Sequence, residues 1–273
     1  MKNLITGGAG FIGSHLAEYL LSQGEEVVVL DDLSTGSFEN IRHLVGTSGF
    51  THYITKVENE RVLERAIESV DRIYHLAAAV GVQLIINDPV RTIETNINAT
   101  QAVLEQAVIL GKRVLLTSTS EIYGKKNKLP FYEDDDVVYG STTRFRWSYA
   151  ISKAVDEFLL LAYHMQKGLP GIIVRLFNTV GPRQTGRYGM VVPRFVQQAI
   201  SGGPITVYGT GRQTRCFAHV LDVVPALHAL MNCDQAVGKV VNIGNDTQVS
   251  INHLAERIRE VLNLKVDIVK IPF

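Results

Sequence analysis

Up to residue 177 the chain shows two hydrophobic patterns, short continuous apolar runs and longer segments with apolar residues at helical spacing. Short runs rich in Val, Ile and Leu predict buried strands at residues 3–6, 27–31, 51–54, 72–76, 114–118 and 172–176, with a later one at 240–243. Apolar residues at helical spacing predict helices at residues 11–23, 59–69, 90–110 and 149–166. Continuous apolar strands alternating with amphipathic helices are typical of a parallel sheet that helices cover on both faces. We therefore predict an α/β fold with a Rossmann-type, doubly wound parallel sheet.

The pattern loosens from residue 178 onward, where glycine–proline and glycine–glycine pairs divide the chain into short pieces. This change predicts a sheet domain over residues 1–177 and a smaller region over residues 178–273, some segments of which return to the sheet. In open α/β sheets, ligands bind beyond the carboxyl ends of the strands. The residues that follow each predicted strand are therefore the first candidates for chemistry.

Composition excludes several classes of partner. The 27 basic residues balance the 27 acidic ones, so there is no electrostatic footprint for nucleic acid or for an anionic membrane. No apolar run approaches the ~20 residues that span a bilayer. Cys216 and Cys233 lack the spacing of metal ligands and predict reduced thiols in a cytoplasmic protein that holds no metal.

A glycine-rich turn joins the first predicted strand to the first helix. Gly8, Gly10 and Gly13 fit the G-x-G-x-x-G pattern, in which the backbone approaches a pyrophosphate at a helix N-terminus. Asp31 ends the second predicted strand, 18 residues after Gly13 and near the offset of about 20 for a ribose-binding acid. A carboxylate there would accept from the ribose 2′-OH and repel a 2′-phosphate, which favours NAD over NADP. The alternative for Asp31 is a solvated turn residue.

Two polar segments follow this motif. TSTSEIYG, from Thr117 to Gly124, lies where the buried run 114–118 ends. Tyr149 and Lys153 are four residues apart and share one face of a predicted helix. A nearby ammonium stabilises a phenolate, so such a tyrosine can exchange a proton with a hydroxyl group. An ordinary surface pair is the alternative, and it loses weight because the other motifs precede it in order.

The segments TGGAGFIG, VLDDLSTG, HLAA, TSTSEIYG, YAISK, RLFNTVGPR and RCFAHVLDV together carry a family resemblance. The chain resembles the extended short-chain dehydrogenases/reductases, and among them the nucleotide-sugar epimerases, dehydratases and decarboxylases. The resemblance implies tightly held NAD in residues 1–177 and a nucleotide sugar, most commonly a UDP-sugar, held mainly by residues 178–273. It also implies a homodimer in which the helices at 90–110 and 149–166 form a four-helix bundle.

The resemblance assigns roles to individual residues. It implies that Tyr149 removes the proton of the sugar 4-OH, that Thr119 binds this hydroxyl, and that Ser120 and Glu121 complete the catalytic group. Lys153 also holds the nicotinamide ribose. The cofactor contacts that it implies are Gly7, Gly10, Phe11, Ile12, Gly13, Asp31, Asp32, Ser34, Thr35, Gly36, Leu76, Ala77, Ala78, Asn96, Tyr149 and Lys153. The substrate contacts are Thr119, Asn178, Arg187, Val191, Thr206, Val207, Tyr208 and Arg215.

The chain also departs from the family pattern. Lys56 stands where family members usually carry an aspartate that accepts from the adenine amino group, so we expect the backbone of Val57 to make this contact instead. Family members generally continue for a few dozen residues beyond Phe273.

The reaction is predicted from the residues around the catalytic pair. Dehydratases resemble STDEVYG, and Ser120 replaces their aspartate here. Decarboxylases of UDP-glucuronate resemble STSEVYG, which matches, but they tend to carry YDEGK where this chain has YAISK. Arg183 and Arg187 are candidates to meet a C6 carboxylate.

We therefore predict a UDP-sugar 4-epimerase that acts on UDP-glucose/galactose or UDP-glucuronate through a 4-keto intermediate. UDP-glucuronate decarboxylase is the first alternative, followed by a 4,6-dehydratase. A non-catalytic NAD-binding protein is the alternative from a different class.

Overall fold

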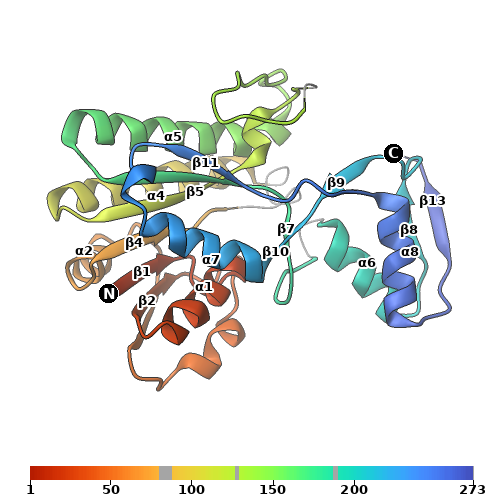
Figure 1. The fold of residues 1–273 in the computed structure, drawn as a ribbon, viewed down its shortest axis with the longest axis horizontal. Coiled ribbons are helices and arrows are strands. Elements are labelled where there is room, and N and C mark those ends of the chain that lie inside the picture. Colours follow the sequence, from red (N-terminus) through yellow and green to blue (C-terminus); the bar gives the residue numbers. More distant parts are fainter. Residues whose placement is uncertain (80–87, 127–128, 187–189, 273) are drawn as a thin grey trace.

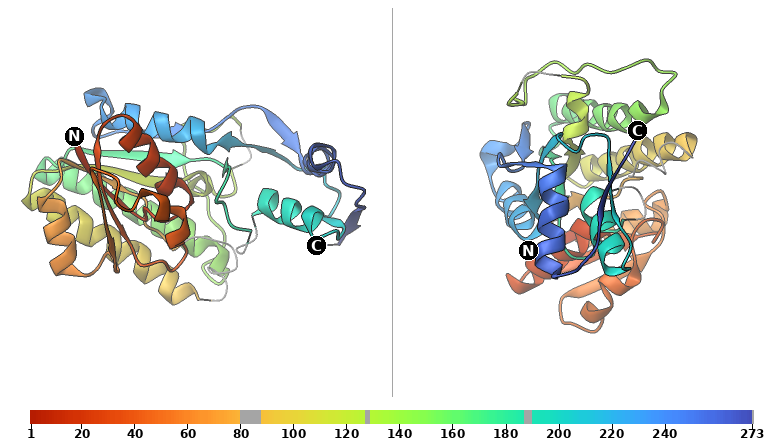
Figure 2. Two further views of the ribbon diagram at one scale, coloured as in Figure 1. Left: turned by 90° about the horizontal axis from the view of Figure 1, so that it is seen from below. Right: turned by 90° about the vertical axis from the view of Figure 1, so that its right-hand side faces the viewer.

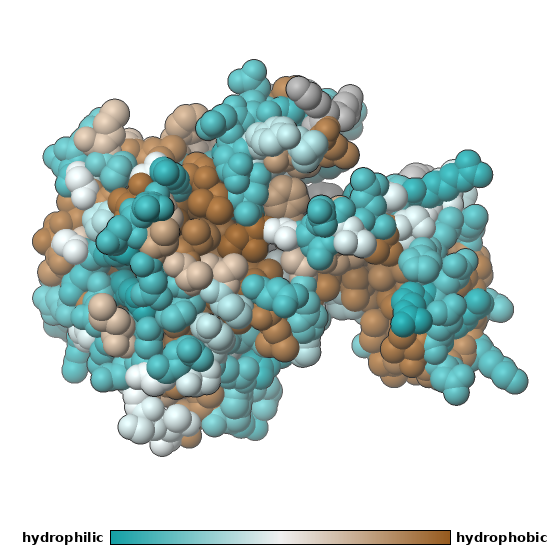
Figure 3. All heavy atoms as spheres, in the orientation of Figure 1, coloured by the Kyte–Doolittle hydropathy of each residue, from teal (hydrophilic) through white to brown (hydrophobic). Residues whose placement is uncertain are grey.

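The computed structural model describes residues 1–79, 88–126, 129–186 and 190–272. A larger α/β lobe and a smaller lobe lie side by side, joined by short paired segments (Figures 1 and 2). The space-filling view shows the narrowing between them (Figure 3).

Seven parallel strands form the central sheet of the larger lobe, in the order β11-β6-β5-β4-β1-β2-β3. These strands are β1 (Lys2–Thr6), β2 (Glu26–Asp31), β3 (Phe50–Ile54), β4 (Arg72–His75), β5 (Arg113–Thr119), β6 (Gly171–Leu176) and β11 (Val240–Ile243). The predicted Rossmann-type sheet is confirmed.

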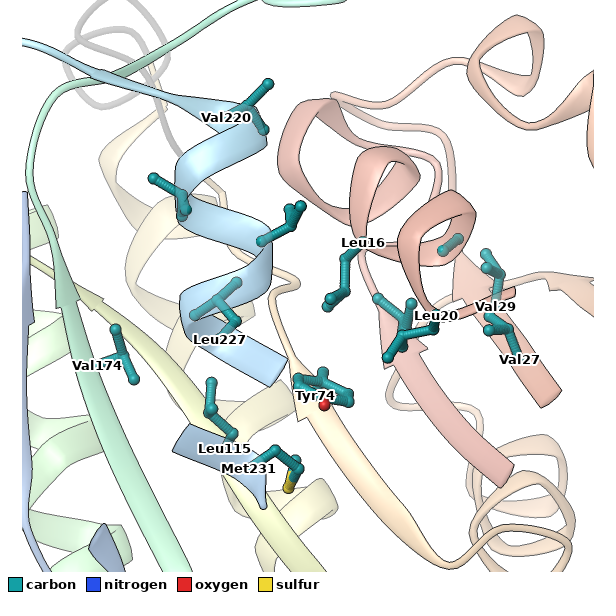
Figure 4. Close-up of a cluster of buried hydrophobic side chains, with 14 of the residues drawn as sticks. Leu16, Leu20, Val27, Val29, Tyr74, Leu115, Val174, Val220, Leu227 and Met231 are labelled. Carbon is teal, nitrogen blue, oxygen red and sulfur yellow. The ribbon is translucent and has the colours of Figure 1, made fainter. Parts of the chain in front are cut away.

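Helices cover both faces of this sheet. They are α1 (Phe11–Ser22) and α7 (Val220–Met231) on one face, and α2 (Glu60–Glu68), α4 (Pro89–Ile109) and α5 (Ser148–Lys167) on the other. Successive residues of a strand point to opposite faces. Val27 and Val29 of β2 therefore pack beside α1 (Figure 4), in a cluster to which α7 also contributes, while Val28 and Leu30 pack toward α2 and α4. Burial on both faces explains why these strands are continuous apolar runs.

The smaller lobe has a core of its own. Phe195 and Ala199 of α6 (Val191–Ile200) pack against β8 (Ile205–Tyr208) and α8 (Ile251–Leu262). β8 pairs in parallel with β13 (Ile268–Ile271). The connections to the larger lobe contain β7 (Thr179–Val180) paired with β10 (Ala218–His219), and β9 (Thr214–Cys216) paired with β12 (Gln248–Ser250). Although α7 and β11 lie beyond residue 178, they belong to the larger lobe.

Short 3-10 helices mark several chain reversals. They are η1 (Phe38–Asn40), η2 (Arg42–Leu44), η3 (Ser120–Tyr123), η4 (Phe145–Trp147) and η5 (Asp234–Ala236). η3 directly follows β5 and η4 directly precedes α5, so both lie at the carboxyl edge of the sheet, where ligands are expected.

A buried polar cluster ties the opposite edge of the sheet together. Arg72 of β4 donates to Asn3 Oδ1 at 2.6 Å and to both carboxylate oxygens of Glu25 at 2.7 and 2.8 Å. It also donates to Asn232 Oδ1 at 2.5 Å, and His228 of α7 lies 3.2 Å from Glu25 Oε1. Two sheet strands and one covering helix are thereby joined through a single carboxylate.

Candidate active site

The turn between β1 and α1 is shaped by its glycines. Gly7 has φ of +74°, in the left-handed region that favours glycine. A Cβ placed on Gly13 would lie 2.2 Å from the Gly7 carbonyl oxygen, so helix and turn approach more closely than any side chain permits. The N-cap residue of α1 is Gly10, and no side chain caps the helix there. The uncapped amides of the first turn suit a phosphate group.

A cavity of about 460 Å³ opens beside this turn. Thirteen residues that the sequence predicts as cofactor contacts line it, namely Gly7, Gly10, Phe11, Ile12, Gly13, Asp31, Asp32, Ser34, Thr35, Gly36, Leu76, Ala77 and Ala78. They come from the ends of β1, β2 and β4 and from the start of α1. The structure thus brings segments far apart in the chain around one space.

Asp31 braces the backbone at the end of β2. Its Oδ2 accepts from the Ala9 amide at 2.9 Å and its Oδ1 accepts from the Leu33 amide at 2.8 Å. Burial raises the pKa of Asp31, and these amide hydrogen bonds partly offset that rise. A carboxylate can accept more than two hydrogen bonds, so Asp31 can brace the turn and still accept from a ribose hydroxyl. It is buried, which excludes the solvated-turn alternative.

The segment after β3 contributes Val57 and Glu58 to the cavity lining. Val57 was expected there, through its backbone, because Lys56 replaces the usual aspartate. Glu58 was missed, although its position two residues beyond Lys56 is a signal that the sequence offers. Its carboxylate provides an acceptor of the kind that the usual aspartate would supply.

Asn96 joins two parts of the site from its buried position on α4. Its Oδ1 accepts from the Ala79 amide at 2.7 Å, and its Nδ2 donates to Ser152 Oγ at 3.1 Å. Ser152 in turn donates to the Tyr149 carbonyl oxygen at 2.9 Å. Asn96 therefore fixes the loop after β4 against the helix that carries the predicted catalytic pair. The cavity lining does not include Asn96, so its predicted role as a direct cofactor contact remains a prediction.

Tyr149 and Lys153 are buried on the first turns of α5. This excludes the alternative of an ordinary surface pair. Burial raises the pKa of the Tyr149 phenol, the carboxylates of Glu121 and Asp156 add to the rise, and a hydrogen bond with the Thr119 side chain opposes it. The Lys153 Nζ donates to Asp156 Oδ2 at 2.8 Å.

The segment Thr119–Ser120–Glu121 turns from β5 into η3. Thr119 is the N-cap of η3, and its Oγ1 accepts from the Glu121 amide at 3.2 Å. This turn places the Glu121 side chain at an accessible surface near Tyr149. The protein packed around Glu121 raises the pKa of its carboxyl group, and the positive charge of Arg146 partly offsets that rise. A threonine hydroxyl, a carboxylate and a phenol thus converge at the end of β5.

Arg146 was not predicted as a site residue. It lies on η4, and its guanidinium carbon is 4.5 Å from the centroid of the Trp147 ring. Lys125 Nζ lies 5.7 Å from the same ring, so two cations flank one indole close to Glu121. The signal available in the sequence is the position of Arg146, three residues before Tyr149.

Arg183 is placed differently from the prediction. Its guanidinium donates to Ser14 Oγ at 3.2 Å and pairs with Glu18 at 2.5 Å, both on α1, and it lines the cofactor cavity. It therefore lies beside the cofactor cavity and not at a sugar carboxylate near Glu121. The reason is its pairing with Glu18, a partner that the sequence around Arg183 does not reveal. Arg187 lies outside the described residues.

Asn178 and Arg215 lie close together in the connections between the lobes. Asn178 Nδ2 donates to the Cys216 carbonyl oxygen at 3.0 Å, and the exposed Arg215 donates to the Thr214 carbonyl oxygen at 2.8 Å. Asn178 directly precedes β7 and Arg215 lies on β9, within the connections between the two lobes. Their roles toward a diphosphate remain predictions.

The predicted base-binding segment is β8 of the smaller lobe. The Thr206 amide donates to Gln198 Oε1 at 3.0 Å, and the Thr206 hydroxyl accepts from Gln198 Nε2 at 2.7 Å. The Val207 side chain is fully buried in the core of this lobe, so only its backbone can reach a ligand. Tyr208 is exposed, with the guanidinium carbon of Arg194 at 4.8 Å from its ring centroid. Val191 begins α6 and is half-buried.

Neither a membrane-spanning helix nor a metal-binding cluster is found among the described residues. None of the helices there is long and apolar enough to cross a membrane. The described His, Cys, Asp and Glu residues form no group of three or more that could hold a metal ion.

The model of the NAD dependent epimerase/dehydratase family matches residues 3–244. The chain belongs to this family. Its cofactor is NAD, and the cavity beside the glycine turn fits that group because an uncapped helix N-terminus and the buried carboxylate Asp31 adjoin it. The predicted family resemblance is confirmed.

Curated relatives in this family share about two fifths of their residues with the chain. UDP-N-acetyl-alpha-D-glucosaminuronate decarboxylase of Bacillus cytotoxicus is 41% identical over 271 residues, covering 99% of this chain and 83% of that protein. UDP-glucuronic acid decarboxylase 1 of Xenopus tropicalis is 40% identical over 95% of this chain. The chain spans 60% of the length of that Xenopus protein.

A solved member of the family has the same fold throughout. The structure of UDP-glucuronic acid 4-epimerase from Bacillus cereus, in complex with UDP-glucuronic acid and NAD, superposes with a TM-score of 0.90 at 31% identity. It matches 100% of this chain and 86% of that chain. The chain thus has the fold of solved members of the NAD dependent epimerase/dehydratase family along its full length, and the two relatives above are named as decarboxylases, whereas the sequence analysis ranked 4-epimerisation first.

Proposed function

We propose that the chain is an NAD-dependent decarboxylase of a UDP-hexuronate. The observation that carries this proposal is the placement of Glu121 beside Tyr149 at the end of β5, in a chain whose curated relatives are UDP-hexuronate decarboxylases. The proposal replaces our prediction of a 4-epimerase with its first alternative. The sequence analysis ranked the epimerase first on local stretches that include YAISK, whereas the identity to the decarboxylases extends over nearly the whole chain.

NAD, when bound, supplies the oxidant that accepts a hydride from C4 of the sugar and later returns it. Tyr149 takes the proton of the C4 hydroxyl in the same oxidation, while Thr119 orients that hydroxyl. The resulting 4-ketone makes the C6 carboxylate part of a β-keto acid. The bond between C5 and C6 then breaks and CO2 leaves. The electron pair of that bond moves toward the ketone oxygen. A proton from solvent then replaces the carboxylate on C5, and Tyr149 returns its proton to the C4 oxygen as the hydride would return to C4, which completes a UDP-pentose.

Lys153 is the group that makes Tyr149 usable as a base. The burial of Tyr149 and the carboxylates near it favour the neutral phenol, as the raised pKa indicates. A positive charge one helical turn away favours the phenolate instead. Lys153 therefore acts on the proton transfer through Tyr149, in addition to its predicted contact with the nicotinamide ribose.

Glu121 and Arg146 act on the substrate carboxylate in this proposal. Arg146 is exposed and positively charged at the sugar end, where a guanidinium can bind a carboxylate in two-point fashion. Glu121 places a negative charge near the same group. Since that repulsion disappears when neutral CO2 leaves, it favours expulsion over retention of the carboxylate.

A UDP-sugar 4-epimerase remains the second candidate. The residues YAISK around the catalytic pair favour it, and the Bacillus cereus 4-epimerase matches the entire chain in fold. An epimerase would have to keep the carboxylate in an orientation that prevents loss of CO2 from the 4-keto sugar.

The deciding experiment incubates the purified protein and NAD with UDP-glucuronate, UDP-N-acetylglucosaminuronate, UDP-glucose and UDP-galactose separately. Products are identified by mass spectrometry and proton NMR. Loss of one CO2 from a uronate with formation of a UDP-pentose is expected. Unchanged mass with inverted C4 would establish the epimerase, and loss of water a dehydratase. Bound NAD without turnover of any of the four sugars would support the non-catalytic alternative.

We also propose a homodimer through α4 and α5. Ile109, Phe158 and Met165 on these helices are each more than 70% exposed, an unusual placement for large apolar side chains. Pairing with the same helices of a second copy would cover them. Sedimentation equilibrium of the purified protein should give twice the mass of one chain.

A further inference from the structure

Asp156 makes an ion pair with Lys153 in the interior of the protein. The Nζ and Oδ2 atoms are 2.8 Å apart, and the two side chains are 2% and 0% exposed. The residues are three apart on α5, so both belong to the helix that carries Tyr149. None of the motifs in the sequence assigns Asp156 a role.

Burial of this depth disfavours the charged form of a lysine side chain. A buried ammonium without a counter-charge loses its proton, with pKa decreases of up to ~3–5 units for fully buried groups. A lysine neutralised in this way could not stabilise the Tyr149 phenolate. The carboxylate of Asp156 offsets the loss of water because it interacts with the ammonium at hydrogen-bond distance.

The other titratable groups around Lys153 do not replace Asp156. His75 of β4 is fully buried between Thr6 and Thr100, and burial, assisted by the charge of Lys153, lowers its pKa to about 3. Glu157 of α5 is engaged by Arg175 of β6 at 2.8 and 3.0 Å. Glu121 of η3 lies toward the sugar end, beside Arg146 of η4.

We propose that Asp156 is a positioning residue that keeps Lys153 protonated and in place, so that its charge reaches the Tyr149 phenolate. The inference rests on the proposed function insofar as Tyr149 is the base of that reaction. Asp156 thereby acts through Lys153 and contacts neither the sugar nor the reacting atoms.

The same carboxylate has an opposite, direct effect, since a negative charge near Tyr149 disfavours its phenolate. Distance decides between the two effects. Lys153 is one helical turn and Asp156 nearly two turns from Tyr149, so the ammonium is the nearer charge, although the two charged atoms are only 2.8 Å apart. Electrostatic energy falls with distance, so loss of the nearer positive charge outweighs loss of the more distant negative charge.

The test measures the pKa of Tyr149 without any sugar. Phenolate absorbance is titrated with saturating NAD and without it, and the signal of the matching Tyr149→Phe protein is subtracted to isolate one tyrosine. Asp156→Asn should raise the pKa of Tyr149, by less than the ~1–3 units of a lone neighbouring charge, because a positive and a negative charge are lost together. Asp156→Glu, which keeps the charge, should restore most of the original value.

Two further variants and one kinetic measurement accompany this titration. Glu157→Gln removes a buried carboxylate from the next position of α5 and should lower thermal stability without moving the Tyr149 titration. Asp156→Ser is measured beside Asp156→Asn, so that a folding defect of one variant does not end the test. With the uronate substrate, the acid limb of kcat/KM should move upward in pH by the same amount in Asp156→Asn, with little change in KM.

A Tyr149 pKa that stays constant or falls in folded Asp156→Asn and Asp156→Ser proteins would overturn the inference, because the direct repulsion would then dominate. This result is distinguishable from failure of the proposed function. If no UDP-hexuronate is turned over, the absorbance titration still shows whether Asp156 controls the Lys153–Tyr149 pair.

Discussion

The two ends of the site are built from different materials. The cofactor end is built around backbone, where the glycine turn meets the uncapped start of α1, with the carboxylates of Asp31 and Glu58 beside it. The sugar end consists of charged side chains on short 3-10 helices, with Glu121 on η3 and Arg146 on η4. The glycine turn and the buried Asp31 carboxylate shape the cofactor end, whereas we propose that a few exposed charges govern what happens to the sugar. One family can therefore keep its cofactor site while its members differ in reaction.

The largest expected effect is at the catalytic pair, where the two ends meet. Tyr149→Phe removes the acid–base hydroxyl but keeps the ring, so turnover should fall by about 10²–10⁴-fold. NAD binding, followed by fluorescence or by co-purification, should persist. Tyr139→Phe is the matched control, because burial raises the pKa of Tyr139 to about 12 while its hydroxyl lies 3.5 Å from the Ala150 carbonyl oxygen. Loss of activity in both variants alike would place the effect in folding.

The next effect tests the backbone character of the cofactor end. Gly13→Ala would place a Cβ 2.2 Å from the Gly7 carbonyl oxygen, which the packed turn cannot absorb without moving. We expect NAD affinity to fall by at least about 10-fold, or about 1.4 kcal/mol, measured by isothermal titration calorimetry. Gly203→Ala is the control, since its Cβ would meet only the Gln198 carbonyl oxygen at 3.8 Å. Unchanged NAD affinity in Gly13→Ala would show that the turn is not the diphosphate site.

The third effect tests the charges of the sugar end. Glu121→Gln removes the repulsion proposed to favour loss of CO2, so decarboxylation of the uronate should fall by about 10-fold or more, which corresponds to about 1.4 kcal/mol in the barrier. NAD affinity should not change. Arg146→Gln should chiefly raise KM for the uronate, and the exposed Arg144→Gln on the same segment should have little effect. If Glu121→Gln instead released more CO2 from a protein that inverts C4, the epimerase would be the correct assignment.

The sequence predicts the cofactor end better than the sugar end, for a physical reason. Strands such as β2 are buried on both faces, so their hydrophobic runs identify them without tertiary information. The glycine turn is similarly local, because strand, turn and helix are contiguous between Lys2 and Ser22. These parts of the fold depend on neighbours in the sequence.

The parts that were missed depend on partners far apart in the chain. Arg183 was expected at the sugar carboxylate, but it pairs with Glu18, which lies 165 positions away. Val207 was expected to line the base, but the core of the smaller lobe takes its side chain. Asp156 could have been noticed from its spacing of three from Lys153, yet the pattern of α5 does not reveal that both are fully buried.

The smallest expected effect lies away from both ends, in the polar cluster at the opposite edge of the sheet. Burial would raise the pKa of Glu25, but hydrogen bonds from Arg72, Asn3 and His228 and the charge of Arg72 together hold it below its usual value of 4.5. A carboxyl group with a lowered pKa stabilises the fold above its unfolded pKa, and this contribution is lost as pH falls through the folded pKa.

Glu25→Gln should therefore reduce the free energy of unfolding at neutral pH by about 1–3 kcal/mol, because Arg72 stays buried without its counter-charge. The loss should shrink as the pH of a urea titration falls below about 4.5, where the unfolded carboxyl group takes up a proton, and should vanish below the lowered folded pKa, where the native group is protonated as well. Glu26→Gln, at an exposed pair with Lys2, should change stability by less than about 1 kcal/mol at any pH. Neither change should alter the NAD affinity or the turnover of the protein. Equal losses of stability in the two variants would show that the buried cluster contributes no more than a surface ion pair.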